Sequence, residues 1–277
     1  KVISFLRKKM IENNFLEFQT PILTASSPEG ARDFLVPSRT HQGKFYALPQ
    51  APQQFKQMVM IAGFDRYFQI APCFRDEDGR ADRSPGEHYQ LDMEMSFVEQ
   101  EDIFKIVEPI FYELFKKFGK NRTVNKHPFP RITYKDALNK YGTDKPDLRI
   151  TTTIQDFTDI FEDTEISFIS DTIKKGNPVK GFILNKILSR SEIDVLDQEI
   201  KELGSPGLGW FKIEDNSISG PLAKIINSKE TIKLSEYKDS TIIFQAGEVK
   251  MISPILDYLR TKLFGYEGND DYIFAWI

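Results

Sequence analysis

Three polar side chains with strong hydrogen-bonding groups lie two positions apart near the end of the first third of the chain. They are Gln90, Asp92 and Glu94, and apolar residues separate them. Because successive side chains of a strand point to opposite faces, this period of two predicts a strand with one polar and one apolar face. The chemistry available on the polar face is that of two carboxylates and an amide.

The polar strand has a predicted partner, and an arginine lies where that partner ends. Residues 67–74 form an apolar run that ends at Arg75, and a charged loop with the turn formers Gly79, Pro85 and Gly86 separates the two runs. Two such strands, with an arginine at a strand exit, could hold an anionic ligand over the polar face. The alternative is an ordinary solvated hairpin loop, because loop charges of mixed sign usually neutralise one another.

The composition restricts the classes of function. The chain has 277 residues, a net charge of −4 and a pI of about 5.6, which excludes a broadly basic nucleic-acid surface, so contact with RNA needs a local patch. Cys73 is the single cysteine, and neither a CxxC pair nor clustered histidines indicate zinc. No apolar run approaches the ~18 residues of a membrane span, and no signal peptide is visible. We expect a cytoplasmic protein with no membrane association.

Two regions of different character are predicted along the chain. In the first, helices are expected at the N-terminus and over 53–62, 101–118 and 132–141. From about residue 151 the chain is richer in Ile, Lys, Ser and Thr, which indicates a separate α+β domain. The elements expected in that domain are strands over 182–188, 208–214 and 241–245 and helices over 192–203 and 252–264.

Both ends of the chain are expected to be cuts in a longer protein. The chain begins at Lys1, without a methionine and already inside an amphipathic helical pattern. It stops within the apolar run 274–277, which is typical of a strand. We therefore expect a fragment.

Several motifs, in one order over the whole chain, resemble the bacterial-type aspartyl-tRNA synthetases of class II. The segments 74–77 (FRDE) and 90–94 (QLDME) resemble motif 2 of that class in its aspartyl form. The segment 17–23 is similar to motif 1, which forms the family's dimer interface around a proline. Residues 27–33 resemble a loop that closes on substrate, and 47–57 resemble the aspartate-recognition segment. The ensemble is far more specific than any one of these motifs.

The resemblance implies an α+β fold, in which a partial class II synthetase catalytic domain with an antiparallel sheet carries an inserted, smaller α+β domain. Residues 1–149 would be the first part of the catalytic domain, with motifs 1 and 2. Residues 150–271 would be the insertion domain of the bacterial type, and 272–277 the start of the return to the catalytic domain. The family's anticodon-binding barrel and its motif 3 have no counterpart in this sequence, so we expect the chain to be inactive alone.

The implied activity is that of an aspartate–tRNA ligase. L-Aspartate attacks ATP to form aspartyl-adenylate and pyrophosphate, and the aspartyl group is then transferred to the 3′ end of tRNA(Asp). Because the carboxylate and the α-phosphate repel each other, a guanidinium that bridges both anions would stabilise the transition state. The resemblance assigns this catalytic role to Arg75. It also implies a homodimer, with Pro21 at the interface.

The resemblance divides the aspartate-binding residues between the two ends of the substrate. The ammonium group would be bound by Glu29, Gln90 and Asp92. The side-chain carboxylate would be bound by Lys56, with Gln53 beside it. Gln90 and Asp92 are two residues apart, so both are expected on the polar strand face.

The nucleotide would be bound at the start of the charged loop. Asp76 and Glu77 would bind ATP beside Arg75, with Glu77 accepting a hydrogen bond from the adenine amino group. Glu94 would help to hold Mg²⁺ between phosphates. Alternatively, Glu94 pairs with an arginine of the loop.

Two other functions remain open. An ammonia-dependent asparagine synthetase-like enzyme would share the aspartyl-adenylate site without anticodon binding. A non-catalytic dimerisation fragment would need none of this chemistry. Charging of tRNA(Asn) besides tRNA(Asp) also stays open, because the sequence includes no anticodon-binding barrel.

Overall fold

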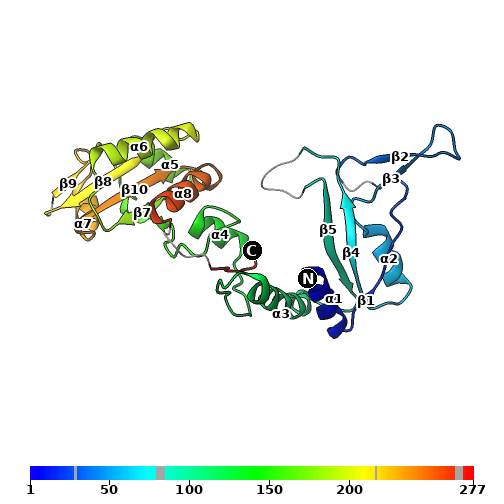
Figure 1. Cartoon of the computed structure of the whole chain (residues 1–277). Helices are drawn as coiled ribbons and strands as arrows, with labels where there is room; N and C mark the ends of the chain where they lie inside the picture. Colours follow the sequence, from blue (N-terminus) through cyan, green and yellow to red (C-terminus); the bar gives the residue numbers. More distant parts are fainter. Residues whose placement is uncertain (28–29, 79–84, 216, 266–270) are drawn as a thin grey trace. The chain divides into compact units, whose positions relative to one another are not determined.

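The computed structural model divides the chain into two compact units, Lys1–Pro128 and Phe129–Ile277 (Figure 1). It describes residues 1–27, 30–78, 85–215, 217–265 and 271–277. No described helix is long and apolar enough to cross a membrane. Each unit has its own sheet and its own core.

The first unit is built on a three-stranded sheet with two helices packed on one face. β1 pairs in parallel with β4, and β4 pairs antiparallel with β5 over its whole length. The Phe5 and Phe118 rings meet edge to face at 5.7 Å and join the two helices. The strands are β1 (Leu16–Glu17), β4 (Arg66–Phe74) and β5 (Glu87–Met95), and the helices are α1 (Val2–Glu12) and α3 (Gln100–Phe118).

The core of this unit confirms the predicted alternation in β5. Met10 of α1, Phe68 of β4 and Ile110 of α3 are buried together, and Leu91 and Met93 of β5 pack against them. The apolar face of β5 therefore lies against the helices. Its polar face is left on the opposite side of the sheet, where the site residues are.

Two further elements lie on the polar side of the first unit. α2 (Gln53–Ile61) begins directly after Pro52, as predicted, because proline needs no intrahelical partner in the first turn. β2 (Leu35–Pro37) and β3 (Phe45–Ala47) form an antiparallel hairpin that the sequence did not predict. Strands of three residues are too short to show a period, so no pattern indicated them.

The second unit is a five-stranded sheet with helices on both faces. All of its strand pairs are antiparallel, in the order β6-β7-β10-β8-β9. Alternation in β10 sends Ile243 into one core and Ile242 and Phe244 into the other. The strands are β6 (Gln155–Asp156), β7 (Val179–Leu184), β8 (Gly209–Glu214), β9 (Ser217–Ser219) and β10 (Ser240–Ala246).

The helices of the second unit form two layers. α6 and α8 contribute to the core on one face of the sheet, and α5 and α7 contribute to the core on the other. The α+β class and the antiparallel pairing predicted for the chain are thus confirmed. The helices are α4 (Tyr134–Tyr141), η1 (Thr158–Ile160), α5 (Ser167–Lys174), α6 (Arg190–Glu202), α7 (Ser228–Ser235) and α8 (Val249–Phe264).

The strand predicted over 182–188 begins and ends too late. β7 is Val179–Leu184, and the residues after it leave the sheet. Leu188 is buried like a strand residue, but its N–H donates to the Thr241 Oγ1 at 2.9 Å and not to a neighbouring strand. An apolar run can thus be buried without strand pairing, which is why the pattern predicts too long a strand here.

The compact second unit begins earlier than the predicted domain boundary near residue 150. The buried Arg260 of α8 donates to the backbone carbonyls of Asp147, Ile150 and Thr152 at 2.9, 2.6 and 2.7 Å. These bonds tie the segment before residue 150 to α8. Compactness does not define an insertion, so the boundary at 149/150 stays a prediction.

The two ends of the second unit lie side by side. The Trp276 N–H donates to the Pro130 carbonyl at 2.9 Å, and the Ile132 N–H donates to the Trp276 carbonyl at 2.8 Å. The Phe129 and Phe274 rings stack at 5.3 Å beside this pairing. The first and last segments of this unit are therefore joined to each other.

We expect Gly142→Ala to destabilise the second unit by about 2–4 kcal/mol. Gly142 ends α4 with φ +79°, a conformation that favours glycine. A Cβ at this position would also lie 2.5 Å from the Ser253 carbonyl and 2.9 Å from the Asp257 N–H nitrogen of α8. Urea unfolding of the chain, followed by circular dichroism, measures the loss.

Gly204→Ala is the matched control for this substitution. Gly204 ends α6 with φ +91°, but a Cβ there has nothing within 4 Å. It should therefore lose only the backbone cost of about 1–2 kcal/mol. Equal losses at the two positions would contradict a close contact between α4 and α8.

Candidate functional site

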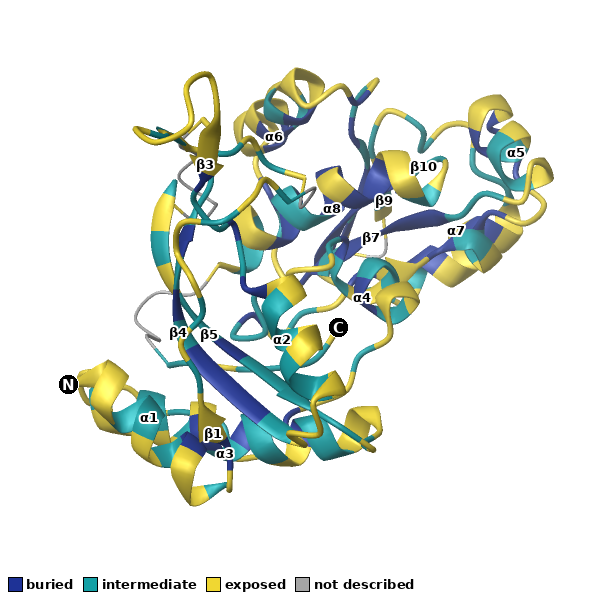
Figure 2. Ribbon diagram, turned by 90° about the vertical axis from the view of Figure 1, so that its right-hand side faces the viewer, coloured by how far each residue is buried: buried dark blue, intermediate teal, exposed yellow. Residues whose placement is uncertain are grey.

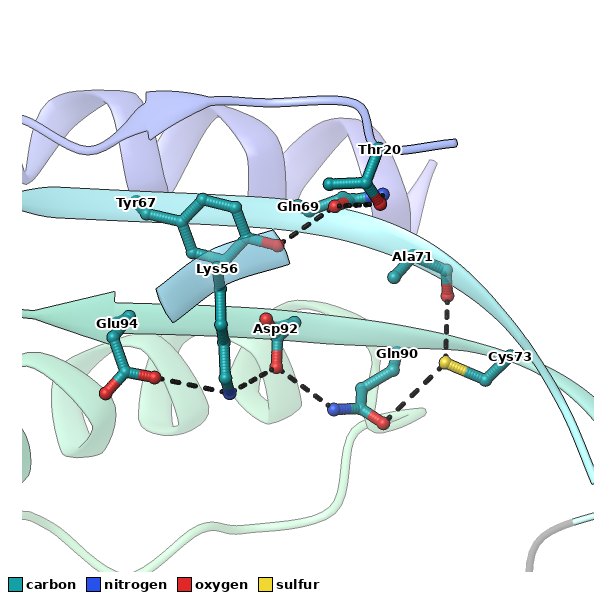
Figure 3. A network of polar contacts seen from close by, with 9 residues as sticks. All are labelled: Thr20, Lys56, Tyr67, Gln69, Ala71, Cys73, Gln90, Asp92 and Glu94. Atoms are coloured by element: carbon teal, nitrogen blue, oxygen red, sulfur yellow. Dashed lines mark hydrogen bonds and ion pairs between the residues drawn. The ribbon is translucent and has the colours of Figure 1, made fainter. Parts of the chain in front are cut away.

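The candidate site is the polar face of the β4–β5 hairpin, with α2 beside it (Figure 3). Gln69 is paired with Asp92, and Tyr67 with Glu94, in the antiparallel register, so these four side chains share one face. Lys56 reaches this face from α2 and lies between Asp92 and Glu94 (Figure 3). The structure thus brings residues from three elements together.

An ion-pair cluster is the centre of the site. The Lys56 Nζ lies 3.0 Å from the Asp92 Oδ1 and 3.3 Å from the Glu94 Oε2. The side chains of Lys56 and Asp92 are only 13% and 4% exposed, whereas that of Glu94 is 41% exposed. Burial by itself lowers the pKa of Lys56, but hydrogen bonds to Asp92 and Glu94 outweigh it, so this pKa lies above its ordinary value.

Asp92 has one oxygen that the cluster leaves unsatisfied. Its Oδ1 accepts from the Lys56 Nζ and, at 3.2 Å, from the Gln90 Nε2. Its Oδ2 is buried and has no hydrogen-bond partner in the described parts of the chain. A buried carboxylate oxygen without a donor is costly, so this atom is suited to a ligand that donates, such as an ammonium group.

A second hydrogen-bonded group supports the floor of the site. The fully buried Tyr67 donates its hydroxyl proton to the Gln69 Oε1 at 2.9 Å, and Gln69 pairs with the Thr20 hydroxyl at 3.1 Å. The Cys73 thiol is directed at the Gln90 Oε1 at 3.8 Å. These hydrogen bonds restrain the side chains that lie next to Asp92 on the polar face.

The sequence did not single out Thr20, Tyr67 or Gln69. Tyr67 and Gln69 are two residues apart and therefore share a face, and their register opposite Glu94 and Asp92 makes that face the polar one. They were instead included in an apolar run because most of its residues are apolar. Thr20 is 49 residues from Gln69, and no local pattern predicts that contact.

Arg75 lies just past the end of β4. Its backbone N–H donates to the Gly86 carbonyl at 2.7 Å, which closes the base of the charged loop. Its half-buried guanidinium makes no hydrogen bond or ion pair with any other residue that the structure describes. Among the described residues, the arginine is therefore held through its backbone and not through its side chain.

The start of the charged loop is tied to the segment that resembles a closing loop. The Asp76 N–H donates to the Arg32 carbonyl at 2.9 Å, and the Arg32 Nε donates to the Asp76 carbonyl at 3.0 Å. Glu77 is exposed. This pairing joins two segments that the resemblance places on the same substrate.

A small pocket lies between the closing-loop segment and α2. It has a volume of about 150 Å³, and the buried Gln50 lines it. Gln50 donates to the Ala31 carbonyl at 2.9 Å and accepts from the Ala31 N–H at 3.1 Å. This amide holds the base of the loop against the start of α2.

The remaining predicted site residues are less well connected. Gln53 is exposed at the first position of α2, one turn before Lys56, and Pro21 is exposed beside Thr20. Glu29 lies outside the described residues, as do the loop arginines Arg80 and Arg83. In the described ranges, no three His, Cys, Asp or Glu side chains form a ready metal site.

The position of Tyr67 makes its hydroxyl less acidic. Burial, together with the nearby Asp92 carboxylate, raises the pKa of Tyr67 above its ordinary value of 10.0. Above pH 10 the unfolded chain loses this proton while the folded chain keeps it. Stability is therefore complete below pH 10 and falls as pH rises toward the folded pKa.

We expect the free energy of unfolding to fall by up to about 1.4 kcal/mol per pH unit above pH 10 because of Tyr67. The pKa of Lys56 is also raised, so its contribution to stability is likewise lost at high pH. In urea unfolding between pH 9 and 11, Tyr67→Phe should remove the contribution of this one proton to the slope of the unfolding free energy with pH. Tyr89→Phe, which removes an exposed hydroxyl, is the control. An unchanged slope in Tyr67→Phe would disprove the assignment.

The comparison with protein families agrees with the fold. Residues 1–275 match the family of class II tRNA synthetases for D, K and N. The chain belongs to this family. The resemblance recognised in the motifs is thereby confirmed, and so is the class II character of the fold.

Individual relatives are aspartate–tRNA ligases. The aspartate–tRNA(Asp/Asn) ligase of Orientia tsutsugamushi (strain Boryong) is 49% identical over 289 residues, covering 100% of this chain and 48% of that protein. The aspartate–tRNA ligase of Streptomyces avermitilis is 50% identical over 284 residues, covering 100% of this chain and 48% of that protein. The chain thus spans about half the length of the curated relatives that it matches.

Proposed function

We propose that the chain supplies the aspartate-activating part of an aspartate–tRNA ligase. The observation that supports this most directly is the buried Asp92, with a free oxygen, paired to Lys56 on the polar hairpin face. The relatives named as aspartate–tRNA ligases match this chain from end to end. Residues 1–149 would be catalytic and 150–271 would be inserted.

The cluster offers complementary charges to L-aspartate. The substrate ammonium would donate to the Asp92 Oδ2 and to Gln90, with Glu29 closing over it. The side-chain carboxylate would take Lys56 as its partner, with Gln53 beside it. Because the Lys56 Nζ contacts Asp92 at 3.0 Å, we infer that it exchanges part of this ion pair for the substrate carboxylate.

Arg75 would act on the reacting groups. Its guanidinium has no ion pair among the described residues, and it can bridge the attacking carboxylate and the α-phosphate of ATP in a bidentate manner. Asp76 and Glu77 follow it directly and would bind the nucleotide, Glu77 through the adenine amino group. Catalysis would rest on positioning and charge stabilisation, without a covalent nucleophile.

Mg²⁺ would be held by Glu94 together with the phosphates of ATP. Glu94 is the most exposed member of the cluster, and only its Oε2 is paired with Lys56, which leaves carboxylate oxygen available. Mg²⁺ commonly uses one or two carboxylates plus substrate phosphates, so the residues present fit it. The ion would neutralise phosphate charge.

The partners of the whole protein follow from the same proposal. They are L-aspartate, ATP and tRNA(Asp), and the enzyme would act as a cytoplasmic homodimer with Pro21 at the interface. A relative named aspartate–tRNA ligase is 50% identical and one named aspartate–tRNA(Asp/Asn) ligase is 49% identical, so similarity does not decide on tRNA(Asn).

The test is ATP–pyrophosphate exchange by the full-length natural protein that contains this chain, offered aspartate, asparagine, glutamate and lysine separately. Exchange with aspartate alone would support the proposal, whereas a folded protein without exchange would refute it. Asparagine formation from ammonia without tRNA would favour the asparagine synthetase alternative. The 277-residue chain alone should give no exchange, in keeping with its lack of motif 3.

A further inference from the structure

The β2–β3 hairpin is an exposed projection that the proposed chemistry does not use. All residues from Arg39 to Tyr46 are exposed, and Figure 2 shows β3 and the loop before it in yellow. Leu35 and Phe45 are 57% and 56% exposed, although both are apolar. Apolar side chains at this level of exposure on a projecting element suggest a contact surface.

The base of the hairpin is firmly attached to the first unit. Ala47 is buried, its N–H donates to the Thr24 carbonyl at 2.8 Å, and its carbonyl accepts from the Thr24 N–H at 3.0 Å. The Leu48 N–H donates to the Phe34 carbonyl at 2.9 Å. The projection is therefore anchored at its base.

The tip of the hairpin is held by its own hydrogen bonds. The Ser38 N–H donates to the Lys44 carbonyl at 2.9 Å, and the Lys44 N–H donates to the His41 carbonyl at 3.1 Å. The Ser38 Oγ accepts from the His41 N–H at 3.1 Å. Gly43, with φ +76°, allows the turn. An ordered tip can present side chains without a large ordering cost on binding.

The charge around the hairpin differs from that of the chain as a whole. The chain has 41 acidic residues among 277, yet none lies between Asp33 and Asp65. Arg39 and Lys44 lie in this stretch at the tip, and neither forms an ion pair with another described residue. The tip is thus a local cationic patch on a chain of net charge −4.

Cations and aromatic rings are interleaved on this patch. Lys44 and Tyr46 are two residues apart on β3 and its entry, so they share one face of the hairpin, while Phe45 faces the other side. Tyr46 is 38% exposed. Unpaired cations next to exposed rings are the pattern by which proteins bind RNA, with phosphates on the cations and bases on the rings.

We propose that the β2–β3 hairpin, residues 35–47, is an RNA-binding surface that contacts the tRNA substrate through Arg39, Lys44 and Tyr46. This inference rests on the proposed function for the identity of the RNA. An acidic protein surface would complement the cations, but it would give no role to the exposed ring of Tyr46. RNA uses both.

Binding of a fluorescently labelled tRNA(Asp) transcript to the 277-residue chain tests the surface directly. Arg39→Ala/Lys44→Ala should bind about tenfold more weakly at 100 mM salt, with a slope of log K against log salt that is flatter by about 1.5. Tyr46→Leu should weaken binding about fivefold or more with an unchanged slope. Lys174→Ala/Lys175→Ala removes the same charge from exposed positions elsewhere and should bind like the wild type.

The outcomes separate this inference from the proposed function. In the full-length protein, Arg39→Ala/Lys44→Ala should keep wild-type ATP–pyrophosphate exchange with aspartate while its KM for tRNA rises about tenfold. If the wild type shows exchange and both double variants bind tRNA equally well, the RNA-binding role of the hairpin is refuted and the proposed function is not. No exchange by the wild type would overturn the proposed function, and the binding assay would still decide on the hairpin. Displacement of tRNA from the hairpin by poly-L-glutamate at equal charge concentration would show a generic anion site and would also overturn it.

Discussion

Arg75→Ala should reduce aspartate-dependent ATP–pyrophosphate exchange by at least about 10³-fold in the full-length protein that contains this chain. The reason is that adenylate formation would bring a carboxylate against the α-phosphate, and the proposed function assigns the neutralisation of both to the guanidinium at the exit of β4. Because each exchange cycle passes through this encounter in both directions, the loss should appear in the rate at saturating aspartate and ATP.

The same substitution should leave the fold intact. The Arg75 side chain makes no bond to another described residue, and its backbone bond to Gly86 survives in alanine. The free energy of unfolding of the first unit, measured by urea titration, should therefore change by less than about 0.5 kcal/mol. Arg75→Lys keeps the charge but loses the bidentate fork, and it should recover only a small part of the activity. Near-normal exchange in Arg75→Ala would remove the catalytic assignment.

Lys56→Met should lower the stability of the first unit by about 3–5 kcal/mol, the second large effect that we expect. Methionine has a similar length but no charge, so it leaves the Asp92 carboxylate buried with the amide of Gln90 as its remaining donor. An unpaired buried charge costs far more than a lost surface ion pair. Urea unfolding of the 277-residue chain measures this without any need for activity.

A double variant identifies the cause of this loss. Lys56→Met/Asp92→Asn removes both charges at nearly constant volume, so it should recover most of the stability that Lys56→Met loses. Lys8→Met is the matched control, because Lys8 forms an exposed ion pair with Glu12 at 3.7 Å and should lose less than about 1 kcal/mol. If Lys56→Met were no worse than Lys8→Met, the cluster would not be the buried pair described above.

The sequence predicted the local arrangement of the site better than its contacts. The alternation of Gln90, Asp92 and Glu94 was enough to place them on one face, because strand geometry is local. The pairing of Lys56 with Asp92 was not predicted, since it depends on how α2 lies across the sheet. The motif resemblance had assigned these two residues to opposite ends of the substrate.

Other parts of the fold were out of reach for similar reasons. The hairpin of β2 and β3 has strands of three residues, which is shorter than any period can show. The three hydrogen bonds from Arg260 span more than a hundred residues. Because the helical pattern around Arg260 is local, it could not predict that this arginine is buried and bonded to those carbonyls. Helices with caps, such as α6 after Ser189 with Glu192, were placed within two residues.

The hydrogen bonds between residues 130–132 and 276 have a topological consequence. About half of the chain is a closed excursion whose two ends are joined by backbone pairing and by the stacked rings of Phe129 and Phe274. The distance between residues 130 and 276 is therefore that of one backbone pair, whatever the length of chain between them. Insertions or deletions inside the excursion would change it without displacing the points where it is attached.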